Sequence, residues 1–396
     1  MAEKFQEAHA VVDRLLLEQR EYSPVELLLA EGRLSYSDYE AWRCGQIATL
    51  EEVLAGNPLR ISNLLEQAGK YALLLGLQAE RREFIGWGAS AGRVLRFSGE
   101  LEELCSVHYR RAGTEVQLDL FMDNSGNVLA DGIVAALTSR RAEDAFMLLD
   151  KLLETDAGHP RLGVLEALCN ATQRLAAPVG DCLAECEFME NYLAPLAARE
   201  LGAAARDFLV LFWRRLALAL RGQPFVADTP FLHASYALGC ARDWAGVKVS
   251  ILEDWSWQDY PLLRTRMAEA EYHQGERQQA LAIWCRMCWD YPVEAEQAFA
   301  PDRELQSAWE RYRELDVEPE LDIRYFPAWL LLERKDTQHA VEYVAQDHGP
   351  IRAYCALHEL LASGSALSER TMELRLKLKQ AHPGLFAIYL RSINRC

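Results

Sequence analysis

Residues 261–292, PLLRTRMAEAEYHQGERQQALAIWCRMCWDYP, hold the pattern that decides the fold of this chain. A helix is predicted over residues 261–274, because Gly275 then supplies the left-handed conformation that ends a helix at little cost. A second helix is predicted after this turn. Its apolar residues recur at the i, i+4, i+7 spacing of one helix face: Ala280, Trp284 and Met287. The stretch therefore predicts two helices folded back on each other.

The order of small and large residues in this stretch follows the pattern of a helical repeat. A glycine turn is followed by a small residue, an aromatic and a proline at five, nine and seventeen positions: Gly275, Ala280, Trp284 and Pro292. This order resembles the tetratricopeptide repeat, a family of stacked helical hairpins. The first helix departs from the family, because Arg264 stands where an aromatic is usual and Ala268 where a glycine is usual. The stretch is therefore described as repeat-like.

Similar hairpins are predicted earlier in the chain. Residues 128–138 and 142–154 form one pair of helices, and residues 243–255, DWAGVKVSILEDW, form the second helix of another. In the latter helix Val247 takes the small-residue position, and Ala280 follows it after 33 residues. This spacing is close to the repeat length of about 34 residues. It favours stacked repeats over a chance similarity.

These patterns predict an all-α protein, a tetratricopeptide-like helical solenoid with a smaller helical N-terminal domain that carries a short extended insert. Four parts are expected, an N-terminal helical domain, a linker, the helical repeats and a C-terminal helical region that caps the solenoid: residues 1–112, 113–126, 127–300 and 301–396. A stack of helical hairpins provides binding surface rather than chemistry.

Within the N-terminal domain, several short helices have recognisable start signals. Ser23, Pro24 and Glu26 match a capping box with proline at the first helical position. Ser35 or Ser37 is expected to begin the next helix. A longer helix that ends at Gly76 is predicted from an apolar stripe: Ile61, Leu64, Leu65, Ala68, Ala72 and Leu75.

Residues 83–98, EFIGWGASAGRVLRFS, interrupt the helical pattern. Their glycines and the apolar pairs at 84–85 and 94–95 predict a small hairpin or an extended lid. Trp87, between two glycines, belongs either to a ligand-contacting loop or, as is more common, to a packing plug between helices. Residues 100–111 predict another helix.

The linker contains a short motif between two groups of turn-forming residues. Five consecutive residues match the consensus of the bacterial sliding-clamp-binding motif at every position: Gln117, Leu118, Asp119, Leu120 and Phe121. The resemblance implies an extended peptide whose glutamine bonds at the rim of the clamp groove, while Leu120 and Phe121 fill an apolar pocket as hot spots. It implies a role in DNA replication or repair.

The same residues have a simpler interpretation. Val116, Leu118 and Leu120 alternate with polar residues, as in a half-buried strand or a linker that docks one domain on the next. The two interpretations differ in accessibility, because a clamp-binding peptide must be exposed or able to detach from its own chain.

The charge of the chain bears on its partners. The formal net charge is −17, which argues against direct nucleic-acid binding or membrane-surface binding, because phosphate contacts need clustered Lys and Arg. The most apolar stretch, residues 208–220, contains Arg214 and Arg215 and is shorter than a bilayer requires. A cytoplasmic location is therefore expected.

Ten cysteines are scattered along the chain, and two pairs of them lie close in sequence. A zinc site would require both pairs, Cys182 with Cys186 and Cys285 with Cys288, to meet in space. The second pair falls inside a predicted helix rather than a knuckle turn, which disfavours this alternative. The sequence thus predicts no metal and no cofactor.

Catalytic motifs with specific spacing are not found in the sequence. Two of the histidines are expected at the surface rather than as catalytic bases: His159 in a loop before a proline, and His273 near a helix end beside Gly275. The sequence predicts a non-enzymatic scaffold or adaptor whose groove, near Trp244, Tyr272 and Trp284, takes a protein segment. The alternatives are an accessory factor tethered to the sliding clamp and an enzyme or zinc protein with an unrecognised site.

Overall fold

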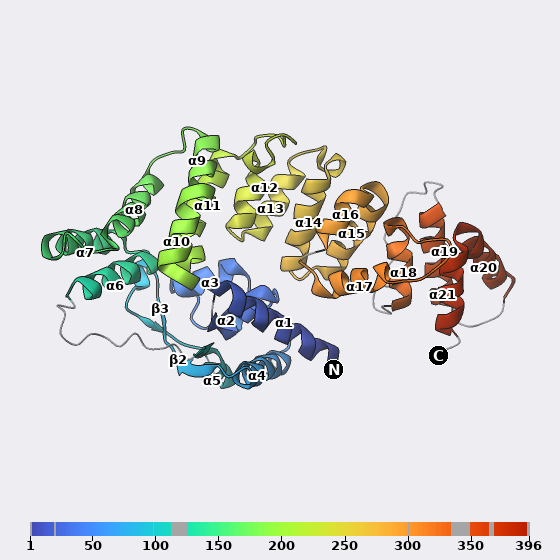
Figure 1. Cartoon of the computed structure of the whole chain (residues 1–396), viewed down its shortest axis with the longest axis horizontal. Helices are drawn as coiled ribbons and strands as arrows, with labels where there is room; N and C mark the ends of the chain where they lie inside the picture. Colours follow the sequence, from blue (N-terminus) through green and yellow to red (C-terminus); the bar gives the residue numbers. More distant parts are fainter. Residues whose placement is uncertain are drawn as a thin grey trace. The chain divides into compact units, whose positions relative to one another are not determined.

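The computed structural model describes residues 2–19, 21–97, 99–111, 125–299, 301–333, 349–363 and 368–393. Helices dominate these residues, so the predicted all-α class is confirmed (Figure 1). The chain divides into two compact units, Met1–Asp254 and Trp255–Cys396. Each unit contains its own cluster of buried hydrophobic residues. None of the described helices is both long and apolar enough to cross a membrane.

The N-terminal part of the first unit begins with two long helices and two short helices between them: α1 (Ala2–Gln19), α2 (Pro24–Ala30), α3 (Tyr36–Arg43) and α4 (Pro58–Leu74). Ser35 begins α3 and accepts a hydrogen bond from the N–H of Asp38 at 3.1 Å. The predicted capping box at Ser23 is correct only in position, because its hydroxyl makes no capping bond. Most of the predicted apolar stripe is buried in α4, but Leu64 is only half-buried and 45% of Leu75, just after the helix, is exposed. Gly76 follows with a φ of 77°.

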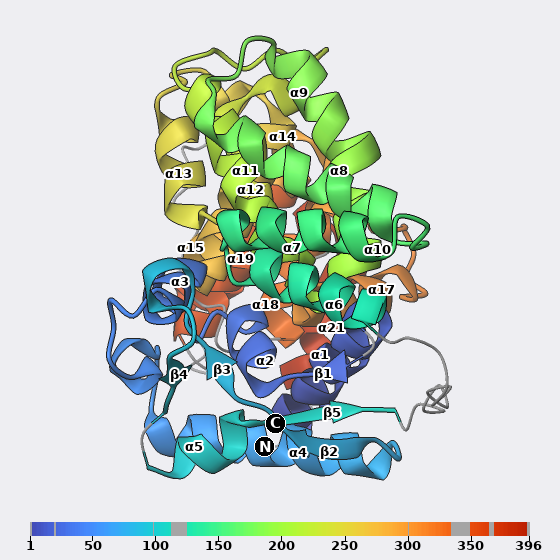
Figure 2. The same cartoon turned by 90° about the vertical axis from the view of Figure 1, so that its left-hand side faces the viewer.

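A small antiparallel sheet, missed in the sequence, lies beside these helices (Figure 2). Its strand order is β1-β5-β2, with β1 at Glu21–Tyr22, β2 at Gln78–Arg81 and β5 at Val107–Arg110. The helix predicted over residues 100–111 is wrong in its second half, since α5 (Glu100–Cys105) ends before β5. The reason is long-range pairing, because β5 pairs with both other strands.

The predicted hairpin within residues 83–98 is confirmed. Strand β3 (Phe84–Ile85) pairs with β4 (Val94–Leu95) in antiparallel fashion. Trp87 is a packing plug, since only 1% of its surface is exposed. Its ring lies between the guanidinium groups of Arg43 and Arg140, whose Cζ atoms are 4.3 and 4.2 Å from the ring centroid. The ligand-contacting alternative for Trp87 is therefore wrong.

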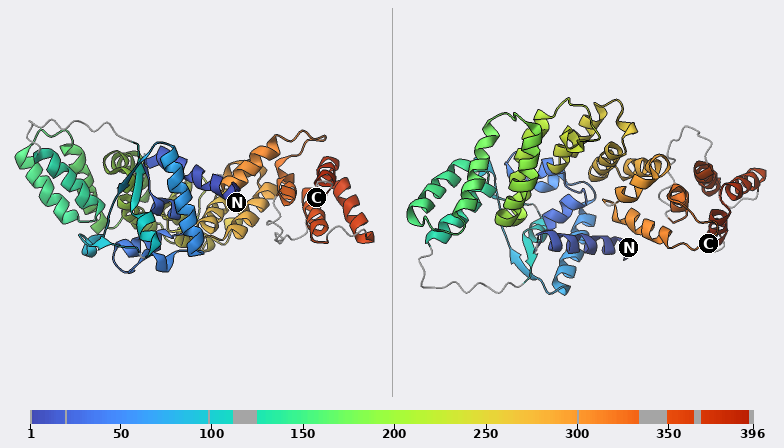
Figure 3. Two further views of the ribbon diagram at one scale, coloured as in Figure 1. Left: turned by 90° about the horizontal axis from the view of Figure 1, so that it is seen from below. Right: turned by 45° about the horizontal axis from the view of Figure 1, so that its top comes forward.

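The rest of the first unit is helical: α6 (Ser125–Thr138), α7 (Ala142–Thr155), α8 (Leu162–Gln173), α9 (Cys182–Phe188), α10 (Ala194–Leu201), α11 (Ala205–Ala219), α12 (Ala234–Cys240) and α13 (Trp244–Leu252). Helices adjacent in sequence pack together, as α6 and α7 show in Figure 3. Helix α11 is buried over most of its faces. It holds the N-terminal helices through Asp207, whose carboxylate accepts a hydrogen bond from Tyr36 at 2.8 Å.

The second unit is also a succession of helices: α14 (Pro261–His273), α15 (Arg277–Asp290), α16 (Pro292–Ala298), α17 (Arg303–Arg313), α18 (Phe326–Glu333), α19 (Gly349–Ser363), α20 (Glu369–Ala381) and α21 (Pro383–Ile393). The two helices predicted within residues 261–292 are thus confirmed as α14 and α15. They pack against each other, as do α18 with α19 and α19 with α20.

Three helical hairpins, α6–α7, α12–α13 and α14–α15, are closed by the same turn. In each, a residue in the left-handed conformation follows the first helix: Arg140 (φ 57°), Arg242 (φ 55°) and Gly275 (φ 85°). Its N–H bonds to the carbonyl three residues earlier, and the next N–H reaches the carbonyl five residues back. This is the Schellman motif. Five residues after each turn lies a buried small or branched side chain: Ala145, Val247 and Ala280.

Candidate binding pocket in the second unit

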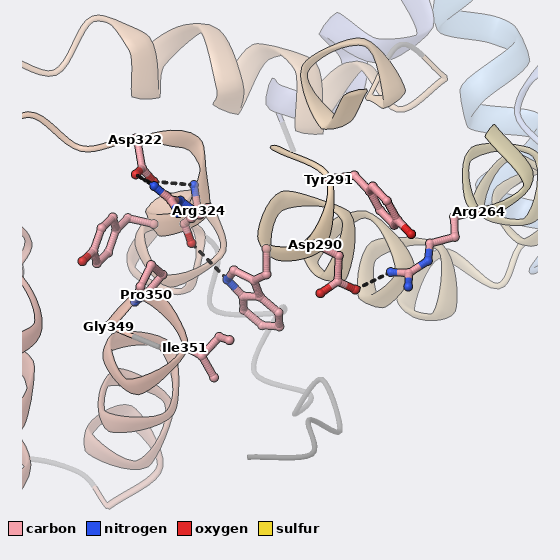
Figure 4. Close-up of a pocket in the computed structure, with 10 residues that line it drawn as sticks. Arg264, Asp290, Tyr291, Asp322, Arg324, Gly349, Pro350 and Ile351 are labelled. Atoms are coloured by element: carbon pink, nitrogen blue, oxygen red, sulfur yellow. Dashed lines mark hydrogen bonds and ion pairs between the residues drawn. The ribbon is translucent and has the colours of Figure 1, made fainter. Parts of the chain in front are cut away.

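A cavity of about 770 Å³ opens between helices of the second unit (Figure 4). Three parts of the second unit form its walls: the start of α14 with the end of α15, the turn before α18, and the start of α19. The lining residues are Arg264, Trp289, Asp290, Tyr291, Asp322, Arg324, Tyr325, Gly349, Pro350 and Ile351. Its volume lies within the range of about 300–1,000 Å³ that is typical of ligand sites.

One wall is organised by Arg264 of α14. Its Nη1 donates to Oδ2 of Asp290 at 2.5 Å, and its Nε donates to the carbonyl of Gln258 at 2.6 Å. The same guanidinium lies over the ring of Tyr291, with Cζ 5.0 Å from the ring centroid. Burial raises the pKa of Tyr291, and its hydroxyl donates to the carbonyl of Asp259 at 2.8 Å. This wall is therefore fixed in place before any ligand binds.

The opposite wall carries a second arginine–aspartate pair. Nη2 and Nε of Arg324 donate to Oδ2 of Asp322 at 2.7 and 3.1 Å. Both side chains remain about half exposed, with 52% and 46% of their surface accessible. Trp289 ties the two walls together, because its Nε1 donates to the carbonyl of Arg324 at 3.0 Å. The exposed charges of this pair are available to a ligand.

The third wall is the start of α19. A Cβ atom on Gly349 would lie 3.2 Å from the hydroxyl of Tyr325, so glycine lets the helix approach this tyrosine closely. That hydroxyl donates to the carbonyl of Ala381 at 3.1 Å, and burial raises the pKa of Tyr325. The first N–H groups of a helix lack partners within the helix and favour acceptor groups.

The pocket carries charges of both signs beside aromatic side chains. Its two arginines are each balanced by an aspartate, so charges of both signs line a cavity with an aromatic wall. Such a surface offers donors and acceptors to a polar chain without favouring one net charge. None of the described lining residues is a serine, cysteine, histidine or lysine.

The sequence-predicted site residues are distributed differently. Gln117, Leu118, Asp119, Leu120 and Phe121 lie outside the described residues, which end at Arg111 and resume at Ser125. The interpretation of this pentapeptide as a clamp-binding peptide stays a prediction.

The aromatic residues predicted to line a groove are partly inside the protein. Trp284 is fully buried and packs against Tyr272, with ring centroids 6.0 Å apart. It therefore lies in the core with Ala280, as predicted for the aromatic of this repeat-like stretch, and does not itself line a groove. Trp244 and Tyr272 are partly exposed.

The cysteine pairs do not form one cluster among the described residues. Cys182 and Cys186 lie on α9 in the first unit, whereas Cys285 and Cys288 lie on α15 in the second. Burial raises the pKa of Cys285 to about 12, which opposes formation of the metal-binding thiolate. Within the described part of the chain, no three His, Cys, Asp or Glu side chains are placed to hold a metal ion.

The predicted surface position of His159 is wrong, since only 7% of this residue is exposed. Its Nε2 lies 3.2 Å from Oδ1 of Asn127, and its Nδ1 accepts from the N–H of Arg161 at 3.3 Å. A histidine with both ring nitrogens engaged in this way connects the start of α6 to the loop before α8. It has a structural role.

Sequence reasoning missed Asp322 and Arg324 as pocket residues, because they belong to a connector without helical periodicity. Arg264 stands out in the sequence only as a departure from the repeat consensus. That departure is the one signal that marks the pocket, because a charged residue replaces an aromatic at a position where helices usually pack.

Comparison with protein-family models, with curated proteins and with solved structures gives no match for this chain. The pocket is therefore interpreted from its own residues and geometry.

Proposed function

We propose that the chain is a non-enzymatic scaffold of tetratricopeptide-like repeats that binds an extended segment of a partner protein in the pocket of the second unit. The observation that carries this proposal is the pocket itself, with an arginine–aspartate pair on each of two walls. The shared turn of the three hairpins supports the repeat assignment.

An extended peptide suits the pocket for a physical reason. Its backbone presents donors and acceptors in alternation, and the pocket offers carboxylates, guanidinium groups and the start of α19. Trp289 and Ile351 line the pocket but are buried, so the polar groups carry the contact with the peptide. Because both walls are held by internal hydrogen bonds, binding requires little reorganisation.

The proposal is tested by panning a random library of linear peptides against the full chain and measuring the affinity of selected peptides. Arg324→Glu removes the cation from the wall formed by Asp322 and Arg324. We expect the affinity for the peptide to fall at least about tenfold, which is the loss expected for a charge-assisted hydrogen bond.

Arg370→Glu is the matched control. Arg370 is an arginine of similar exposure, 55% against 52%, that pairs with Glu359 on the surface of α19 and α20. The proposal is contradicted if the selected peptides bind Arg324→Glu with the same affinity as the unchanged chain. It is also contradicted if no peptide is selected.

A second candidate function rests on the pentapeptide Gln117, Leu118, Asp119, Leu120 and Phe121. We propose that it tethers the scaffold to a bacterial sliding clamp in DNA replication or repair. Leu120→Ala with Phe121→Ala is expected to abolish micromolar binding to a purified clamp, because these side chains are the hot spots of the motif. Val116→Ala, just outside the motif, serves as the control. Absence of clamp binding by the unchanged chain would eliminate this candidate.

A further inference from the structure

A second cavity, of about 480 Å³, lies in the N-terminal part of the first unit. It is bounded by the end of β2, the hairpin β3–β4, helix α5 and the start of β5. The lining residues are Arg81, Arg82, Glu83, Phe84, Val94, Leu95, Arg96, Phe97, Glu102 and Ser106. None of these residues belongs to the scaffold pocket described above.

Some of the charged side chains around this cavity are paired with other described residues, and others are not. Arg82 is occupied, because its Nη1 pairs with Glu21 at 3.0 Å. Glu102 is also occupied, since Oε2 accepts the N–H of Phe97 at 2.7 Å. Arg81 and Arg96 are exposed and form no ion pair with any described residue. Glu83 lies on the same rim, so the free charges are two guanidinium groups against one carboxylate.

A buried hydroxyl group lies in the same wall. Ser106 is only 6% exposed, and its Oγ has no hydrogen-bond partner among the described residues. Its backbone carbonyl is satisfied, because it accepts the N–H of Arg82 at 2.8 Å. Buried hydroxyl groups nearly always have a partner, and Ser106, which lines the cavity, has a hydroxyl to offer to a ligand.

The remaining wall of the cavity is apolar. Phe84 and Phe97 meet edge to face, with ring centroids 5.5 Å apart. Leu95 is buried beside them, while 40% of Val94 is exposed. The cavity thus combines a cationic rim, one unsatisfied hydroxyl and an aromatic wall. A ligand with one charged end and one apolar end would find partners for both in this cavity.

We infer that this cavity binds a small oxyanion attached to a compact apolar group, with Arg81 and Arg96 holding the oxyanion and Ser106 hydrogen-bonding to the ligand. Guanidinium groups suit such ligands because their planar donors match the oxygens of carboxylate and phosphate. The aromatic wall accommodates the apolar body of the ligand.

Phenyl phosphate is the probe for this site, and its binding to the full chain is measured by isothermal titration calorimetry. In Arg81→Gln with Arg96→Gln, we expect the dissociation constant to rise at least about tenfold, because two charge-assisted contacts are lost. In Ser106→Ala we expect a rise of at least about threefold, which corresponds to one neutral hydrogen bond. The hydroxyl has no partner among the described residues to lose, so this variant keeps its fold.

Arg60→Gln with Arg93→Gln is the matched control, because it removes the same charge from two exposed arginines that do not line the cavity. It is expected to bind phenyl phosphate as the unchanged chain does. Phenol, which lacks the oxyanion, is expected not to bind. The inference is overturned if the unchanged chain does not bind millimolar phenyl phosphate, or if either cavity variant binds it with unaltered affinity.

Discussion

The guanidinium of Arg206 lies between the carboxylates of Glu26 and Asp207 in the first unit. It donates to both oxygens of Glu26, at 2.6 and 2.9 Å, and to Oδ1 of Asp207 at 3.0 Å. Its Cζ atom also lies 5.3 Å from the ring centroid of Tyr36. Arg206 and Glu26 are each only 16% exposed, so this arginine shares its single positive charge between two carboxylates that are largely removed from water.

Replacing Arg206 by methionine is expected to lower the free energy of unfolding by about 3–5 kcal/mol, because one partner of a buried ion pair is removed and the other is left uncompensated. Urea denaturation followed by circular dichroism measures the change. Arg199→Met is the control, since Arg199 is 62% exposed and pairs with its sequence neighbour Glu200. It should cost less than about 1 kcal/mol. Equal losses in the two variants would contradict a special role for Arg206.

The carboxylate of Glu26 makes the stability of the protein depend on pH. Burial by itself raises the pKa of Glu26, but Arg206, with smaller contributions from Arg242 and Gln19, outweighs burial and holds this pKa below its ordinary value. A lowered pKa contributes stability that is present above the unfolded-state pKa and is lost as pH falls through the folded-state pKa. The unchanged chain should therefore lose stability below a pH of about 4.5.

In Arg206→Met burial dominates, and the pKa of Glu26 should rise. The sign then reverses, because a protonated Glu26 is tolerated inside the protein, and part of the lost stability should return as pH falls from about 7 to 5. Urea midpoints at several pH values test this. Parallel pH profiles for the two proteins would refute it.

These residues show where sequence reasoning ends at this scale. The sequence marks α11 as strongly apolar, and its burial follows from that. It does not show that Arg206 pairs with Glu26, because the two residues are 180 positions apart. For the same reason Arg43 and Arg140 cannot be assigned to Trp87 from the sequence, although a tryptophan between glycines correctly indicates a packing plug.

At the scale of elements, the hairpin turns show what a local signal can and cannot predict. Gly275 is recognisable because glycine adopts the left-handed conformation without strain. Arg140 and Arg242 adopt the same left-handed region with a side chain present, so no local signal marks them. The predicted end of α5 is wrong for a different reason. The strand that follows it, β5, forms because it pairs with segments distant in sequence.

The turn at Gly275 makes a specific prediction. A Cβ atom added there would meet no other atom within 4 Å, so Gly275→Ala introduces only backbone strain at a φ of 85°. We expect a loss of about 1–2 kcal/mol for a non-glycine residue in this conformation. Gly275→Asn should cost less, because asparagine tolerates the left-handed region. Thermal unfolding of both variants measures the difference.

Gly163→Ala is the control for this prediction. Gly163 lies in α8, where a Cβ atom would likewise meet no other atom within 4 Å and where φ is not positive. Alanine should therefore leave stability unchanged or raise it slightly, because it favours the helix. A loss at Gly163 as large as that at Gly275 would show that the added methyl group itself, not the turn conformation, is responsible.

At the scale of the whole molecule, two separate clusters of buried residues correspond to the two compact units. The sequence predicted repeats that run on through residues 127–300 without a division, because the helical pattern continues across this range. No change in composition marks Asp254. The candidate pocket was equally hidden, since Arg264, Asp290 and Arg324 come together only through the packing of helices and a connector.

The variant Trp284→Ala tests whether each of the two units unfolds cooperatively on its own. Trp284 is fully buried in the second cluster, and its replacement by alanine is expected to cost about 3–5 kcal/mol. Since a domain with its own core unfolds largely on its own, this loss should appear as faster hydrogen exchange in α14, α15 and α18, with α11 as protected as before. Trp255→Ala is the control, because Trp255 is 92% exposed, and its truncation should leave exchange unchanged in both units. An equal rise in exchange in α11 would show that the two clusters unfold as one.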